Sequence, residues 1–105
     1  MEQLRVCRLG VHGELGFPTI EHTPSAIQDA LGGYFEPIGL PSALAAHGFL
    51  GLVDEDGLSK QLPPNKLSPL LGRLIVGQVL IVRADPPEFL TLTDGDCRTL
   101  RKWFG

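Results

Sequence analysis

Residues 60–73 bring together groups that can bind a small anion. Three cations flank the adjacent prolines at 63 and 64, namely Lys60, Lys66 and Arg73. Asn65 follows the prolines and can cap a short turn through Leu67, which would leave main-chain amides pointing outwards. Such amides, together with the ammonium group of Lys66, would hold an anion. The alternative is a stiff connector whose lysines are solvated and bind nothing.

A second group of polar side chains lies in the segment GGYFEPIGL, residues 32–40. If this segment is a strand, its alternation puts Tyr34, Glu36 and Ile38 on one face. A carboxylate beside an aromatic ring would need a hydrogen-bond donor there, whereas on a solvated face it would need none. The candidate ligand-binding residues are therefore Tyr34, Glu36, Asn65 and Lys66.

The other reactive residue types form no catalytic or metal-binding pattern. The histidines, at positions 12, 22 and 47, lack the spacings typical of zinc ligands. Cys7 and Cys97 lie far apart in the chain, so we expect buried apolar thiols in place of a disulfide. The acidic residues 54–56 precede Gly57, which indicates a turn because the spacing of a calcium loop is missing. Glycine patterns for nucleotide phosphates are also missing, so the sequence predicts no catalytic residue, metal or cofactor.

Local signals predict two short helices that frame these residues. Thr23 can cap a helix over 24–31, proline fills its first position, and Gly32 can end it in a left-handed conformation. Thr93, with an acidic residue three positions later, makes a capping-box pattern at the start of a helix over 94–104. Both segments repeat apolar residues at helical spacing, so each should pack one face on the core.

The strands are predicted from runs of β-branched and aromatic residues. They are expected at 4–9, 19–22, 33–40, 74–84 and 88–93, with a hairpin over 49–62, a helical turn over 41–48 and a turn at 85–87. Pro37 cannot donate to a ladder, which favours an edge position for its strand. The run 74–84 is the most apolar, and its Gly77 suggests one long, bent central strand. These elements predict an α+β fold with a mainly antiparallel sheet of five to six strands and two short helices.

Length, net charge and the absence of long apolar runs reduce the classes of protein that fit the sequence. The chain has 105 residues, which is the usual size of one domain, so we expect a single domain over 1–105. Its net charge of −3 lacks the basic excess typical of nucleic-acid binders and argues against that class. We find neither the apolar core of a signal peptide nor a run long enough to span a membrane, which predicts a cytoplasmic protein.

Three segments, taken in order, resemble a domain-of-unknown-function family of small proteins encoded by bacteria, phages and plasmids. They are GGYFEPIGL, LVDEDGLSKQLPPN and FLTLTDGDCRTLRKWF. The positions that match the family pattern are Gly32, Gly33, Tyr34, Glu36, Asp56, Gly57, Leu62, Pro63, Pro64, Asn65 and Gly77. The resemblance extends from about residue 20 onward. It implies an accessory protein of phage or mobile-element type and brings no activity with it.

Two functions of different classes remain compatible with the sequence. The first is a non-enzymatic module that binds an unknown protein or a small ligand, since no nucleophile, metal set or cofactor loop stands out. It could form a homodimer through the edge strand at Pro37 and an exposed apolar stretch at 43–52. The second is a small nucleotide- or metabolite-binding enzyme that uses Glu36, Asn65 and Lys66.

Overall fold

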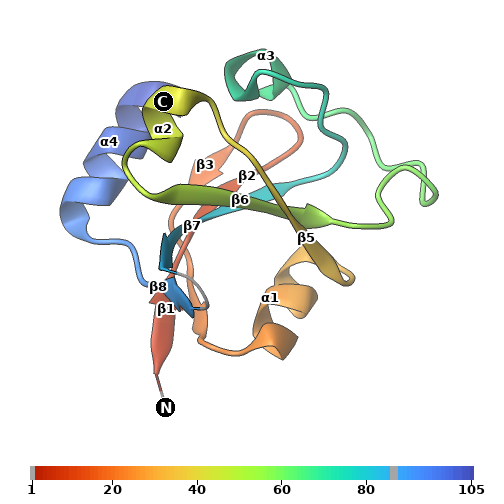
Figure 1. Ribbon diagram of the computed structural model, residues 1–105. Coiled ribbons are helices and arrows are strands. Elements are labelled where there is room, and N and C mark those ends of the chain that lie inside the picture. Colours follow the sequence, from red (N-terminus) through yellow and green to blue (C-terminus); the bar gives the residue numbers. More distant parts are fainter. Residues whose placement is uncertain (1, 86–87) are drawn as a thin grey trace.

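The computed structural model describes residues 2–85 and 88–105 and confirms the predicted α+β class (Figure 1). The strands are β1 (Gln3–Arg5), β2 (Cys7–Leu9), β3 (Leu15–Gly16), β4 (Thr19–Glu21), β5 (Phe35–Ile38), β6 (Phe49–Asp54), β7 (Val79–Asp85) and β8 (Glu88–Leu90). The helices are α1 (Pro24–Leu31), α2 (Ser42–Ala45), α3 (Ser68–Leu71) and α4 (Asp94–Phe104). The turn predicted at 85–87 falls mainly on positions 86 and 87, which lie outside the described residues.

The main sheet has six strands, and its neighbours pair antiparallel in the order β3-β2-β7-β6-β5. Strand β8 pairs with the end of β7, on the edge opposite β6. Strands β1 and β4 form a separate two-stranded sheet. Strand β5 lies at the edge of the main sheet, as Pro37 predicted.

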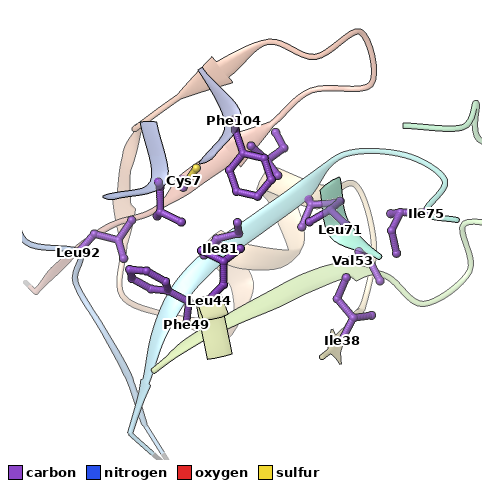
Figure 2. Close-up of a cluster of buried hydrophobic side chains, with 13 residues drawn as sticks. Cys7, Ile38, Leu44, Phe49, Val53, Leu71, Ile75, Ile81, Leu92 and Phe104 are labelled. Carbon is purple, nitrogen blue, oxygen red and sulfur yellow. The ribbon is translucent and has the colours of Figure 1, made fainter. Parts of the chain in front are cut away.

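The central strand β7 is buried on both faces, because helices or strands cover each face of the sheet. Val79 and Ile81 point into one core, and Leu80 and Val82 point into the other. The first core contains side chains of α2, α3 and α4, and Figure 2 shows Ile81 near the middle of it. The second contains side chains of α1 and β1, and Figure 1 shows α1 on the opposite side of the sheet from the other helices.

Both predicted helices are confirmed at their predicted ends. Thr23 Oγ1 accepts a hydrogen bond from the Ala26 amide at 3.1 Å, and Gly32 ends α1 with a φ of 86°. At the start of α4, Thr93 and Asp96 exchange both hydrogen bonds of a capping box. The helical turn expected at 41–48 is also present, as α2.

The hairpin predicted over 49–62 is wrong. Residues 49–54 form β6, but residues 55–61 form consecutive turns in which Gly57 donates to the Asp54 carbonyl at 3.1 Å. The physical reason lies in the sheet: β5 pairs with one edge of β6 and β7 with the other. A returning arm therefore has no free edge of β6 to pair with.

The long strand predicted over 74–84 begins only at Val79. Gly77 precedes the strand and has a φ of 78°, which is incompatible with a continuous ladder. Asn65 caps a short turn through Leu67, as predicted: its Oδ1 accepts from the Leu67 amide at 2.9 Å, and α3 begins only after Leu67. Pro69 lies in the first turn of α3, where proline is tolerated.

Two further expectations need correction. The segment 4–9 forms two short strands in different sheets: Arg5 still pairs with β4, the Val6 amide bonds to the Pro18 carbonyl at 3.0 Å, and Cys7 already pairs with β7. The apolar stretch 43–52, expected to be exposed, has its large side chains in the cores; Leu44, Phe49 and Leu52 are buried. The exposed apolar side chains of that stretch are the small ones of Ala43, Ala45 and Ala46.

Candidate functional site

Two of the most exposed large apolar side chains lie beside the same hollow in the surface. Leu58 is 80% exposed and Leu74 is 70% exposed. Both line a hollow of about 200 Å³, here called the leucine hollow, which lies beside β5 and the end of β6. Its floor consists of side chains from the first core, Ile38, Val53 and Ile75.

Charged side chains surround this apolar centre. Glu36 of β5, Glu55 of the following turn and Arg73 after α3 all line the hollow. All three are exposed, so the hollow has an apolar centre with a charged rim. This is the arrangement that protein interfaces show, with an apolar core inside a polar rim.

The position of Leu58 depends on how the turns after β6 pack against the segment before β7. A Cβ added at Gly57 would lie 3.0 Å from Cγ2 of Val76, so the Val76 side chain packs against the turn where glycine has no side chain. A Cβ at Gly77 would likewise lie 2.9 Å from Leu62. These contacts hold the 57–62 turns against residues 76–77 and thereby bring Leu58 beside Leu74.

An ion pair between Asp54 and Lys60 closes the same turns. The Lys60 ammonium lies 2.7 Å from the buried Asp54 carboxylate and also donates to the Gly32 carbonyl at 3.0 Å. The hydrogen bond from Lys60 lowers the pKa of Asp54, and the Asp56 amide adds to the effect. Lys60 thus joins the end of α1 to the end of β6, which is a structural role.

Tyr34 lies at a second hollow, next to this ion pair. The hollow also includes Asp29, Asp56 and Lys60, and the Tyr34 side chain is 64% exposed. Tyr34 precedes β5, and its carbonyl accepts a hydrogen bond from the Glu55 amide at 2.9 Å. Tyr34 and Glu36 therefore flank the same turn but line different hollows.

Asn65 is 2% exposed, and its side-chain amide is fully engaged with the main chain. Its Nδ2 donates to the carbonyls of Leu9 at 3.2 Å and Gly77 at 2.9 Å. Both amide hydrogens are thus used to hold the segment before β7 against β2. The neighbouring Lys66 side chain is exposed, and its amide donates to the Val11 carbonyl at 2.9 Å.

The structure adds residues to the site that the sequence did not indicate. Leu58 was expected in a hairpin arm and Leu74 at the start of the central strand, and Arg73 was considered only for anion binding. One signal was present in the sequence for Leu58, which follows Gly57 in a polar, turn-forming segment, whereas Leu74 begins the apolar run 74–84 and carried no such signal. A large apolar residue in such a context has no obvious partner inside the protein.

Cys7, His22 and His47 have surroundings that account for them structurally. Cys7 lies in the first core, and burial raises the pKa of its thiol to about 12, which makes it inert at neutral pH. His47 stacks on Phe49, and His22 lies 3.2 Å from the Glu2 carboxylate. Within residues 2–85 and 88–105, no three His, Cys, Asp or Glu side chains are grouped closely enough to hold a metal ion.

The fold and the leucine hollow define an α+β protein with an exposed apolar surface inside a charged rim. A family model described as Domain of unknown function (DUF3846) matches residues 10–105. Because this match covers most of the chain, the chain belongs to that family. The expected membership of a domain-of-unknown-function family is thus confirmed. Searches of the curated proteins and of the solved structures gave no match. In the described part of the chain, no helix is long and apolar enough to cross a membrane.

Proposed function

We propose that this protein is a non-enzymatic binding module whose leucine hollow docks a partner protein. The observation that carries the proposal is the convergence of Leu58 and Leu74 on one apolar hollow. Single exposed leucines are common, but two beside a buried apolar floor form the kind of patch that marks an interaction site. The resemblance to small phage- and plasmid-encoded proteins supports an accessory role for such a module.

The chemistry of the rim indicates what kind of partner segment fits. Glu36 and Glu55 carry two negative charges and Arg73 one positive charge, so the rim is acidic overall. An apolar side chain entering the hollow, followed by a basic residue beside the glutamates, would match this surface. Rim charges of this kind favour encounter and specificity more than affinity.

The adjacent edge strand favours recognition through side chains. The Glu55 N–H donates to the Tyr34 carbonyl, so Tyr34 and Glu55 form a hydrogen-bonded pair of the antiparallel ladder. Hydrogen-bonded and non-hydrogen-bonded pairs alternate along such a ladder. The main-chain polar groups that Phe35 and Pro37 carry therefore point outwards, away from β6. Pro37 has no N–H, so this edge lacks a donor that an added strand would need. Docking by strand addition is therefore disfavoured next to the hollow.

The alternative function, an enzyme that uses Glu36, Asn65 and Lys66, has less support from the geometry. Asn65 would have to give up its hydrogen bonds to Leu9 and Gly77 before it could bind a ligand. Losing buried hydrogen bonds of this kind costs about 1–3 kcal/mol for each group left unpaired.

A photo-cross-linking experiment tests the docking proposal. A benzophenone amino acid at position 58 should cross-link one defined protein in the cells that encode this chain, whereas the same probe at Leu90, 37% exposed on β8, should not. Leu58→Ser with Leu74→Ser should then weaken binding of that protein at least about tenfold. Leu90→Ser is the control, and equal binding by all variants would contradict the proposal.

A second copy of the chain is one possible cross-linked product. It would show that the partner is the same protein and that the chain forms a homodimer. Light scattering during gel filtration then measures whether Leu58→Ser with Leu74→Ser lowers the mass. The substitutions lie on exposed side chains, so folding should change by no more than about 0.5 kcal/mol. A loss of binding or of dimer mass can therefore be attributed to the surface.

A further inference from the structure

A larger hollow lies elsewhere on the molecule and shares none of its lining residues with the leucine hollow. It measures about 510 Å³, which is within the range of small-molecule pockets. Residues before β1, between β4 and α1, in β5 and in β8 all contribute to its walls. It is here called the phenylalanine hollow, after Phe35 and Phe89.

The floor of the phenylalanine hollow is apolar and aromatic. Phe35 and Phe89 meet edge to face, with ring centroids 6.1 Å apart and an interplanar angle of 62°. Both rings are half-buried, so part of each can still contact a ligand. Ile27 of α1 completes the floor and is buried in the second core. An apolar ligand body placed here would displace water from the two rings and the edge of that core.

The rim of this hollow is acidic. Glu2 and Glu88 both line it and are exposed, and no Lys or Arg among the described residues lines it. Glu2 is held in place from two sides: its carbonyl accepts from the His22 amide at 3.1 Å, and its carboxylate lies 3.2 Å from His22 Nδ1. His22 also lines the hollow, so its rim holds two carboxylates and one imidazole, and the rim stays negative whether or not His22 is protonated.

We infer that the phenylalanine hollow binds a small organic cation, a primary ammonium group on an alkyl or aryl body. The body would pack on Phe35, Phe89 and Ile27, while the ammonium would lie between the glutamates and the face of a phenylalanine ring. An ammonium gains from both contacts, since carboxylates attract it directly and an aromatic face attracts cations. A carboxylate or phosphate ligand would instead be repelled by the rim.

The inference is tested with three probes that share one body and differ in charge. Phenethylammonium, 2-phenylethanol and phenylacetate are titrated into the ¹⁵N-labelled protein, and amide shifts of Ile27, Phe35 and Phe89 are followed. The ammonium should bind at least about tenfold more tightly than the alcohol, because it adds ion pairing and cation–π attraction. Phenylacetate should bind more weakly than the alcohol. Equal affinities for ammonium and alcohol, or shifts located elsewhere, would overturn the inference.

Charge-neutralising variants separate a local site from general attraction to an acidic protein. Glu2→Gln with Glu88→Gln should remove most of the preference for ammonium over alcohol. Asp29→Asn with Asp56→Asn changes the net charge equally at exposed positions that do not line this hollow, and should leave the preference intact. An equal loss in both double variants would show attraction by the whole protein and would refute a site at Phe35 and Phe89.

Discussion

Arg83 joins three separate groups at one end of the first core, the carboxylate of Asp96, the carbonyl of His47 and the ring of Phe49. Its Nε and Nη2 donate to the two carboxylate oxygens of Asp96, and Nη1 donates to the His47 carbonyl at 2.8 Å. The guanidinium also lies over the Phe49 ring, 5.4 Å from its centroid. Asp96 belongs to the capping box at the start of α4, and His47 lies before β6. The Arg83 side chain therefore links the last helix to the segment before β6.

The pKa of Asp96 follows from these contacts and makes the stability of the protein depend on pH. The hydrogen bond from Arg83 lowers this pKa, and the amide and hydroxyl of Thr93 lower it further, against the effect of burial. A carboxylate with a lowered pKa contributes stability fully above its ordinary value of about 4. That contribution is lost as the pH falls through the lower pKa of the folded state.

Asp96→Asn should therefore destabilise the protein in a pH-dependent way. At pH 7 the loss of the charged pair should lower the free energy of unfolding by about 2 kcal/mol. The difference from the wild type should shrink as the pH falls from about 4 to about 2, because the wild-type carboxylate then also becomes neutral. Urea denaturation across this pH range measures both free energies.

Glu36→Gln is the control for the loss of a carboxylate at an exposed position. It should change the free energy of unfolding by no more than about 0.5 kcal/mol at pH 7. If the effect of Asp96→Asn stayed constant down to pH 2, the cause would be lost side-chain packing and not the charge that Arg83 stabilises.

At the scale of elements, the junction between α1 and β5 shows two adjacent glycines with different physical roles. Gly32 has a φ of 86° and open space around a hypothetical Cβ, so its requirement is conformational. A Cβ at Gly33 would lie 2.6 Å from the Lys60 ammonium and 3.0 Å from both oxygens of Asp54, so its requirement is space. The ion pair that closes the turns after β6 thus depends on a small residue at position 33.

Gly33→Ala should cost stability chiefly through Lys60. The added methyl group displaces the ammonium and weakens its contacts with Asp54 and the Gly32 carbonyl, at a cost of about 1–2 kcal/mol. In a Lys60→Ala background the same substitution should cost less, because the displaced group is already gone. Urea denaturation of the four proteins gives the coupling free energy.

Gly32→Ala provides the matched control for this cycle. Its cost, about 1–2 kcal/mol for a left-handed conformation, should be the same with or without Lys60 because nothing lies near its Cβ. If Gly33→Ala were equally costly in both backgrounds, the obstacle would be the Asp54 carboxylate, and the assignment to Lys60 would fail.

Elements with local causes were predictable from the sequence, whereas elements that depend on distant partners were not. The ends of α1 and α4 are set by Thr23, Gly32 and Thr93, which act within one helical turn. The missing hairpin after β6 depends on pairing with β5 and β7, which no local pattern encodes. The candidate site follows the same rule. Glu36 could be chosen from the alternation within its own strand, whereas the proximity of Leu58 and Leu74 depends on the packing of two distant turns.

At the scale of the whole molecule, one sheet separates two cores and holds two unrelated surface hollows. The leucine hollow has the first core beneath it, and the phenylalanine hollow adjoins the second, through Ile38 and Ile27 respectively. Strand β7 contributes side chains to both cores in alternation. The integrity of either surface therefore rests on a strand that both cores share.

This arrangement predicts that neighbouring positions of β7 are equally sensitive to truncation. Leu80→Ala removes packing from the second core and Ile81→Ala from the first, and both side chains are completely buried. Each should lower the free energy of unfolding by about 2–5 kcal/mol, and Leu90→Ala, at a partly exposed position of β8, by less than about 1 kcal/mol. A sheet with one solvated face would instead tolerate one of the two substitutions. Guanidinium denaturation measures the three values, and a cost below about 1 kcal/mol for Leu80→Ala would mean that α1 and β1 do not seal the second face.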